Sequence, residues 1–129
     1  MSQQILSMDV EKADEDYKDG IGVDILYKKI TCADGEESDI VMIPHHVGKV
    51  SYSLNVTKNG GEGSVFTTNA PRSEIEAATL ETDDWEENTE GSSTSNLFGN
   101  VLAGVSAIKC KSVSGEIYLR LREGKQHNS

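Results

Sequence analysis

The sequence is poor in long apolar runs, in aromatic residues and in positive charge, and each shortage excludes a class of function. No apolar run approaches the roughly 18 residues of a membrane-spanning helix. Residues 1–17 lack the basic start and apolar stretch of a secretory signal. We therefore expect a protein that is made in the cytosol and has no membrane partner.

Lys and Arg number 12 against 22 Asp and Glu, for a net charge of −10. Because this charge repels a phosphate backbone, we expect no nucleic-acid partner either.

Motifs for catalysis are missing as well. Cys32 and Cys110 have no motif around them, and in a chain without an export signal we expect both to be reduced. No Gly-Lys-Ser/Thr phosphate loop occurs, and the Ser, Thr, Asp and Glu residues fall in polar, turn-rich runs. The sequence therefore predicts a protein that is not an enzyme, has no catalytic residues and needs no cofactor.

Metal-binding patterns are present only in incomplete form. His45 and His46 are adjacent, so on a strand their rings would point to opposite faces and rarely meet one ion. His127 stands alone near the C-terminus. Residues 14–20 are acidic but lack the alternating ligands, central glycine and closing glutamate of an EF-hand loop. We predict no metal site, and a cation held by the acidic residues near Trp85 is the alternative.

Acidic residues are concentrated in three blocks, at residues 9–19, 34–39 and 81–90. Clustered like charges cannot be packed together, so such blocks usually form solvated loops. The rest of the chain has the composition of a folded domain, since 36% of the 129 residues are hydrophobic. A chain of this length makes about one domain with a single core.

Alternation of apolar and polar residues predicts strands between these blocks. The pattern is clearest at residues 50–57 and recurs at residues 21–28, 63–68, 104–111 and 116–122, with a short apolar run at residues 40–43. Turn sequences occupy residues 58–61 and 112–115. They predict two hairpins, one that pairs 50–57 with 63–68 and one that pairs 104–111 with 116–122.

One segment, residues 73–79, fits two structures. Ser73 and Glu76 have the spacing of a helix capping box, whereas Ile75, Ala77 and Thr79 alternate as in a strand. Because an isolated helix of two turns is marginal, we favour a strand.

Several short strands separated by Gly and Asn turns indicate two antiparallel sheets packed face to face. The predicted fold class is all-β: an antiparallel, jelly-roll-like β-sandwich with little helix. This fold offers a place for Trp85, the single tryptophan, which lies among acidic residues. At a strand end its rings can cover the edge of the inter-sheet core while its N–H stays near water. We favour this edge-of-core position over stacking on a ligand.

From residue 47 onward the elements follow a recognisable order. A strand at 48–57 precedes a glycine-rich turn, a strand near Val65 and Phe66, and a strand end at Asp84-Trp85. A Ser/Thr/Asn loop at 92–96 and segments at 100–109 and 114–120 complete it. This order resembles that of small β-sandwich accessory proteins of tailed-bacteriophage virions. The resemblance implies a non-enzymatic structural protein of the head (decoration or cement), neck or tail, which is located in the virion and oligomerises there.

The resemblance also suggests a division of the chain. Residues 1–46 fall outside it and form an acidic segment with one or two strands, either an arm that docks on a neighbouring subunit or an extra pair of strands. Residues 47–124 form the sandwich core. Residues 125–129 form a flexible tail.

The C-terminal end of this acidic chain is locally basic. Arg120 and Arg122 alternate with apolar residues and are expected to face away from the core, as is Tyr118. Opposite electrostatic fields orient two proteins on each other, so we predict that these three residues contact another subunit. The implied partners are other virion proteins and further copies of the chain.

The alternative function is a carbohydrate-binding or adhesion module. Trp85, Tyr52 and Tyr118 would then stack on a sugar, and neighbouring acids would accept its hydrogen bonds. A hydrolase that gathers Asp and Glu from separate loops is the third hypothesis.

Overall fold

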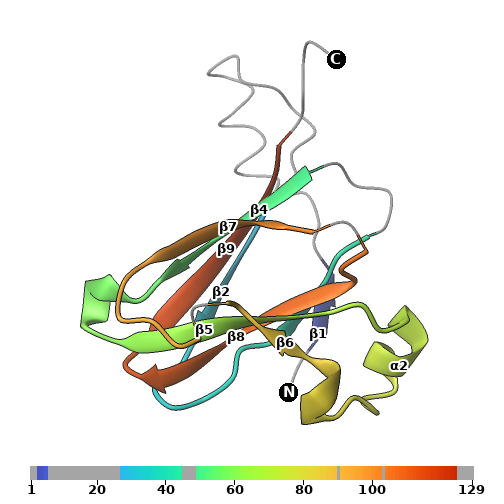
Figure 1. Ribbon diagram of the computed structural model, residues 1–129, viewed down its shortest axis with the longest axis horizontal. Coiled ribbons are helices and arrows are strands. Elements are labelled where there is room, and N and C mark those ends of the chain that lie inside the picture. The colour runs from blue at the N-terminus through green and yellow to red at the C-terminus, as the bar shows by residue number, and fades with distance from the viewer. Residues whose placement is uncertain (1–2, 6–26, 45–48, 90, 103, 125–129) are drawn as a thin grey trace.

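Two β-sheets packed face to face form the protein (Figure 1), so the predicted antiparallel β-sandwich is confirmed. The computed structural model describes residues 3–5, 27–44, 49–89, 91–102 and 104–124. The first sheet consists, in spatial order, of β1 (Gln3–Ile5), β3 (Ile40–Met42), β8 (Ala107–Ser114), β5 (Glu62–Thr68) and β6 (Glu86–Glu87). The second sheet consists of β2 (Tyr27–Cys32), β9 (Ile117–Gly124), β4 (Lys49–Asn55) and β7 (Leu97–Val101). Neighbouring strands are antiparallel except β1 and β3, which are parallel.

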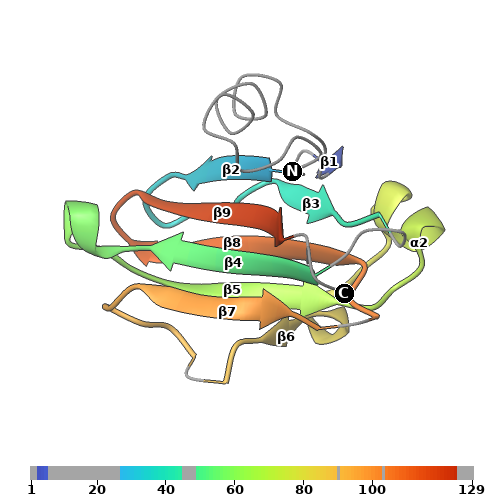
Figure 2. The same cartoon turned by 90° about the horizontal axis from the view of Figure 1, so that it is seen from above.

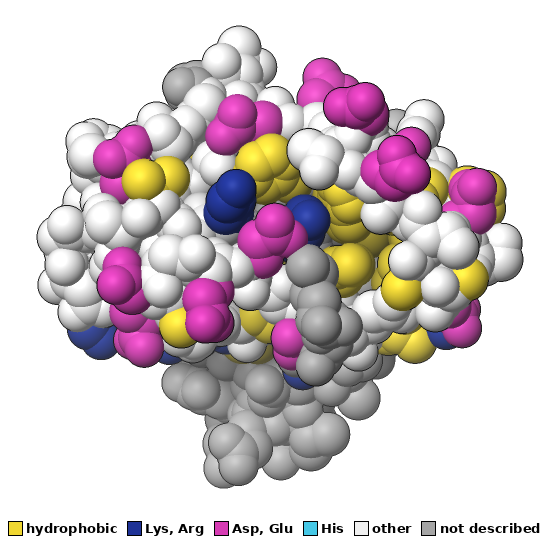
Figure 3. Space-filling view, turned by 90° about the horizontal axis from the view of Figure 1, so that it is seen from below, with side chains coloured by type: hydrophobic (Ala, Val, Ile, Leu, Met, Phe, Trp, Pro, Cys, Tyr) yellow, Lys and Arg dark blue, Asp and Glu magenta, His cyan; other side chains and the backbone are white. Residues whose placement is uncertain are grey.

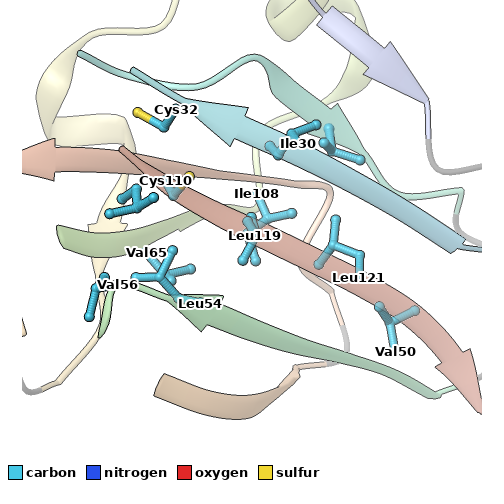
Figure 4. Packing of buried hydrophobic residues seen from close by; sticks show 12 residues of the cluster. Ile30, Cys32, Val50, Leu54, Val56, Val65, Ile108, Cys110, Leu119 and Leu121 are labelled. Atoms are coloured by element: carbon cyan, nitrogen blue, oxygen red, sulfur yellow. The ribbon is translucent and has the colours of Figure 1, made fainter. Parts of the chain in front are cut away.

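The space between the sheets is filled by one apolar cluster to which both sheets contribute alternate residues (Figure 4). Leu54, Leu119 and Leu121 point inward from the second sheet, and Val65 and Ile108 point inward from the first. Burial of one such side chain stabilises a fold by roughly 1.5–3 kcal/mol. The period-two alternation of the sequence therefore holds the two layers together.

The last two described strands lie in the middle of the two sheets. β8 pairs with β3 and β5 in the first sheet, and β9 pairs with β2 and β4 in the second. Figure 2 shows β9 between β2 and β4, with β8 in the layer behind. Strands made earlier in the chain are thus joined through strands made later.

Both predicted hairpins are wrong. β4 and β5 lie in different sheets, as do β8 and β9, so an arch that crosses between the sheets joins each pair (Figure 1). Alternation determines which residues face the core, but a strand can satisfy that pattern from either sheet. In the first arch a 3-10 helix, η1 (Thr57–Asn59), ends at Gly60, which has the left-handed φ of 64° that glycine favours.

The two arches touch each other through glycine. A Cβ atom on Gly61 would lie 2.5 Å from the carbonyl oxygen of Ser114, and one on Gly115 would lie 2.9 Å from the Cα of Gly61. Asn59 Nδ2 also donates a hydrogen bond of 3.2 Å to the carbonyl oxygen of Glu116. The glycines that suggested tight hairpins therefore allow two crossings of the chain to approach closely.

A short helix, α2 (Arg72–Glu76), occupies most of the segment 73–79, so the strand predicted there is wrong. Its Ile75 is 1% exposed and packs with Met42 and Ala107, which point outward from the first sheet. These residues form a second apolar cluster on the outer face of that sheet. Tertiary burial outweighs the low stability that so short a helix has in isolation.

Strands β1, β2 and β3 show where the described part of residues 1–46 lies. β2 pairs with β9 and β3 pairs with β8, so both belong to the sheets of the sandwich. The strand predicted at 40–43 is confirmed, and of the one predicted at 21–28 the structure describes Tyr27 and Lys28. The acidic block 9–19 and the tail 125–129 lie outside the described residues. Among the helices that are described, none is long and apolar enough to cross a membrane.

Candidate functional site

The register of the second sheet gathers cationic and aromatic side chains on its outer face, the one toward the viewer in Figure 2. One row across β2, β9, β4 and β7 consists of Lys29, Arg120, Ser53 and Phe98. The next row consists of Tyr27, Arg122, Ser51 and Asn100. Successive residues of a strand point to opposite faces, and Leu119 and Leu121 face the core, so these rows face outward. The basic face, as we call it, comprises Tyr27, Lys29, Phe98, Tyr118, Arg120 and Arg122.

Tyr118 lies among the cations of the basic face. Lys29 Nζ is 4.5 Å from the centre of its ring, Arg120 Cζ is 5.6 Å away and Lys58 Nζ is 5.7 Å away. The electron-rich face of an aromatic ring attracts cations. Although Tyr118 points outward, it is only 8% exposed. Its ring therefore supports the surrounding cations and is not an open stacking surface.

The cations around Tyr118 carry positive charge that no carboxylate of the described residues neutralises through an ion pair. Within the described ranges the ion pairs are Arg72–Glu76 and Lys109–Glu37. Lys29, Lys58 and Arg120 thus have no carboxylate partner in that part of the chain. The local charge of this face is therefore positive, although the net charge of the protein is −10.

The basic face is hollowed beside Phe98. An open cavity of about 520 Å³ is lined by Tyr27, Ser53, Phe98, Asn100 and Arg120, among others. Phe98 itself is 76% exposed. An exposed ring beside guanidinium, hydroxyl and amide groups can bind an acidic partner through charge, hydrogen bonds and apolar contact.

The outer face of the first sheet has the opposite character. It is covered by α2 and by the segment around a second 3-10 helix, η2 (Thr82–Asp84), and β6 borders it. We call its exposed carboxylates the acidic face; they belong to Glu74, Glu76, Asp83, Asp84, Glu86 and Glu87. Figure 3 shows acidic side chains spread over this side, with basic and apolar ones toward the centre.

Trp85 lies on this acidic side of the sandwich. It is half-buried against the second apolar cluster, which contains Ile75. Lys109 Nζ lies 4.4 Å from the centre of one indole ring and 2.8 Å from Glu37 Oε1. Trp85 thus borders an apolar cluster on the outside of the first sheet, whereas the sequence suggested the edge of the inter-sheet core.

The three aromatic residues considered for sugar stacking are not brought together. Trp85 lies on the outer side of the first sheet and Tyr118 on the outer face of the second, so both sheets separate them. Tyr52 packs against the inter-sheet core, and a Cβ atom on Gly99 would lie 2.7 Å from its ring. The sugar surface predicted from the sequence is therefore not formed by these residues.

Sequence reasoning placed Arg120 and Arg122 on an outward face, and the structure does the same. It missed Tyr27, Lys29 and Phe98, which lie on strands distant from β9 in the sequence. Their proximity depends on how the strands pair, and local alternation carries no information on that. The one local signal was Phe98, a large apolar residue in a run of small polar ones.

The two cysteines belong to the core. Cys32 comes from the second sheet and Cys110 from the first, and both are buried and not joined in a disulfide (Figure 4). Cys32 Sγ donates a hydrogen bond of 2.8 Å to the carbonyl oxygen of Glu36. A hydrogen bond with Cys32 and burial raise the pKa of the Cys110 thiol well above its usual range. Cys110 is therefore held as the neutral thiol, the form that is not nucleophilic.

Metal-binding residues are not clustered in the described part of the chain. No group of three or more His, Cys, Asp and Glu side chains there is arranged to hold an ion. His45, His46, His127 and residues 14–20 lie outside the described residues.

Comparison with known proteins gives no family. No protein-family model matches the sequence, and no curated protein matches it. RmlC from Streptococcus suis, solved in complex with dTDP-D-xylose, has a TM-score of 0.43 and 13% identity over 94% of this chain and 56% of its own. This chain thus spans just over half the length of that protein.

Two further solved structures are similar to this chain, with lower TM-scores. A Bacillus endospore appendage protein, from disulfide-linked pili, has a TM-score of 0.35 and 15% identity over 79% of this chain and 89% of its own. The C-terminal CBM6 of LamC, a laminarinase from Zobellia galactanivorans, has a TM-score of 0.26 and 13% identity over 78% of this chain and 72% of its own. At these identities and TM-scores the likenesses assign no activity.

Proposed function

We propose that this protein is a non-enzymatic structural module that binds an acidic protein surface through its basic face. The observation that carries the proposal is the opposite charge of the two outer faces of one small sandwich. Complementary fields set the orientation and register of two proteins more than their affinity. A chain with one basic and one acidic side would therefore sit on its partner in one orientation.

The residues of the basic face suit such a contact. Arg120 and Arg122 can form paired hydrogen bonds with carboxylates, which a point charge cannot do. Phe98 is an exposed aromatic residue beside them, and aromatic and Arg residues are enriched at the centres of interfaces. Tyr118 holds Lys29 and Arg120 on the same surface. No cofactor or catalytic group is required for this role.

The proposed setting is the virion of a tailed bacteriophage, as a head decoration or cement protein or a component of the neck or tail. Support comes from the order of elements from residue 47 onward. The partner would then be the acidic surface of another virion protein.

The test is incorporation into particles at low salt. Arg120→Glu/Arg122→Glu should abolish it, because two charges at the centre of the contact are reversed. Arg72→Glu/Lys111→Glu changes the net charge equally, at exposed residues on the side of the first sheet, and should leave it intact. Equal incorporation of both variants would exclude the basic face as the docking surface.

A second candidate function is carbohydrate binding on the same face. It is favoured by the cavity of about 520 Å³, where Tyr27 and Phe98 lie beside Ser and Asn side chains. A glycan array probed with the full chain should then give signals that Phe98→Ala removes. Fluorescence of Trp85 would not report this binding, because the indole lies on the other side of the sandwich. An array without any signal would reject this function.

A further inference from the structure

The four strands at the edges of the two sheets differ in how they are protected. An edge strand exposes unpaired backbone N–H and C=O groups, and proteins usually block such edges with charge, proline or short length. In the first sheet, β6 is two residues long and both are glutamate, and β1 is three residues long. In the second sheet, β2 carries Lys28 and Lys29. Three of the four edges are therefore short or charged.

β7 has none of these protections. Its sequence is Leu-Phe-Gly-Asn-Val, and it lies in a run without any Asp, Glu, Lys or Arg, residues 91–108. β7 pairs with β4 on one side and with no described strand on the other. Phe98 in β7 is 76% exposed and Leu102 just after it is 75% exposed. An uncharged, partly apolar edge of this kind is a site where another strand can add to the sheet.

We propose that β7 pairs antiparallel with β7 of a second copy of this chain, which joins the two second sheets into one continuous sheet across a twofold axis. Centred on Gly99, this pairing sets Leu97 opposite Val101 of the other copy, and Phe98 opposite its Asn100. Leu97 and Val101 already pack on the inter-sheet core, so their contact extends that core across the axis. Because a C2 interface uses the same patch twice, an edge that matches itself in this way is sufficient.

The absence of charge makes this edge suitable for pairing with an identical copy. Two copies that each carry −10 repel one another, and the contact must exclude like charges. The run 91–108 is the longest in the chain without an acidic or basic residue. β7 lies within that run, so two copies can meet there without opposing carboxylates.

The dimer would extend the basic face. Phe98 and Arg120 lie in one row that ends at β7, so the rows of the two copies would meet at the axis. The inference does not rest on the proposed function, because the dimer is read from mass in solution and partner binding from incorporation into particles. Either can fail without the other.

Sedimentation of the full chain tests the proposal. The wild-type protein should form a dimer of twice 14.0 kDa at micromolar concentration. Phe98→Lys places a charge on each side of the axis and should raise the dimer dissociation constant by at least about tenfold. Val113→Lys is the matched control, since Val113 is also an exposed apolar residue (53%) but lies on β8, which is inside a sheet. It should leave the dissociation constant unchanged.

Amide hydrogen exchange locates the contact. Backbone amides of residues 97–101 should become more protected as the wild-type concentration rises, and Phe98→Lys should lose this effect. Circular dichroism would show that the variant keeps its fold. A monomer at every concentration would overturn the proposal, and so would a dimer in which residues 97–101 stay unprotected.

Discussion

The two outer faces of the sandwich differ in what lies on them. On the first sheet Met42 and Ala107 point outward, and α2 and Trp85 bury them. On the second sheet the outward positions carry cationic, hydroxyl and aromatic side chains, and the described α-helix lies on the other sheet. A sheet face with apolar residues needs a cover, whereas one with polar residues can remain open. One face therefore contributes to stability, and the other is available for binding.

Ile75→Ala should break the cover of the first sheet and have the largest effect on stability. Ile75 is almost fully buried, and truncation of such a residue costs about 2–5 kcal/mol. Phe98→Ala, on the basic face, should change the free energy of unfolding by less than about 0.5 kcal/mol. Urea denaturation measures both. Equal losses would mean that the two faces do not differ as described.

Gly61→Ala should lower the stability of both sheets together, because the arches connect them. The added methyl group would meet the carbonyl oxygen of Ser114, and overpacking of this kind costs about 1–3 kcal/mol. Thr57→Ala, an exposed change on the same arch, should cost less than about 0.5 kcal/mol. Thermal unfolding compares the two variants. A neutral Gly61→Ala would contradict the tight contact between the arches.

Glu37→Gln should affect only the outer face of the first sheet, which α2 covers. It removes the ion pair that holds Lys109 beside Trp85, at a cost of about 1 kcal/mol. Trp85 fluorescence should change with it, because the cation over the ring moves. Glu36→Gln, one residue away and exposed, is the control and should leave the spectrum unchanged. Unaltered emission in Glu37→Gln would mean that this ion pair does not influence the environment of Trp85.

Tyr118→Leu should affect the outer face of the second sheet and have the smallest effect on the free energy of unfolding. Loss of the ring removes the attraction to Lys29, Lys58 and Arg120, worth roughly 0.5–1 kcal/mol. Added salt should restore part of the loss, because it screens the repulsion between these cations. Tyr118→Phe keeps the ring and serves as the control. The measurement is urea denaturation at low and high ionic strength, and a loss independent of salt would contradict the electrostatic account.

The sequence predicted the strands and the two-layer architecture because period-two burial is a local property of each strand. It did not predict which strands share a sheet. Residues 63–68 pair with β8, and their alternation would be the same if they paired with β4. The helix at Ile75 was missed because its stability comes from Met42 and Ala107, far away in the chain. The same holds for the candidate site. Arg120 could be placed on an outward face from its own strand, but Lys29 joins it only through register.

The central position of β9 in the second sheet has a consequence for synthesis on the ribosome. β2 and β4 are each hydrogen-bonded to β9, which contains the last residues of the chain that the structure describes. Until residues 117–124 have been made, β2 and β4 lack the strand that pairs with both of them. Their apolar sides are then exposed to other polypeptides. The sandwich can close only after β9 has left the ribosome, so the earlier strands cannot complete the second sheet before then.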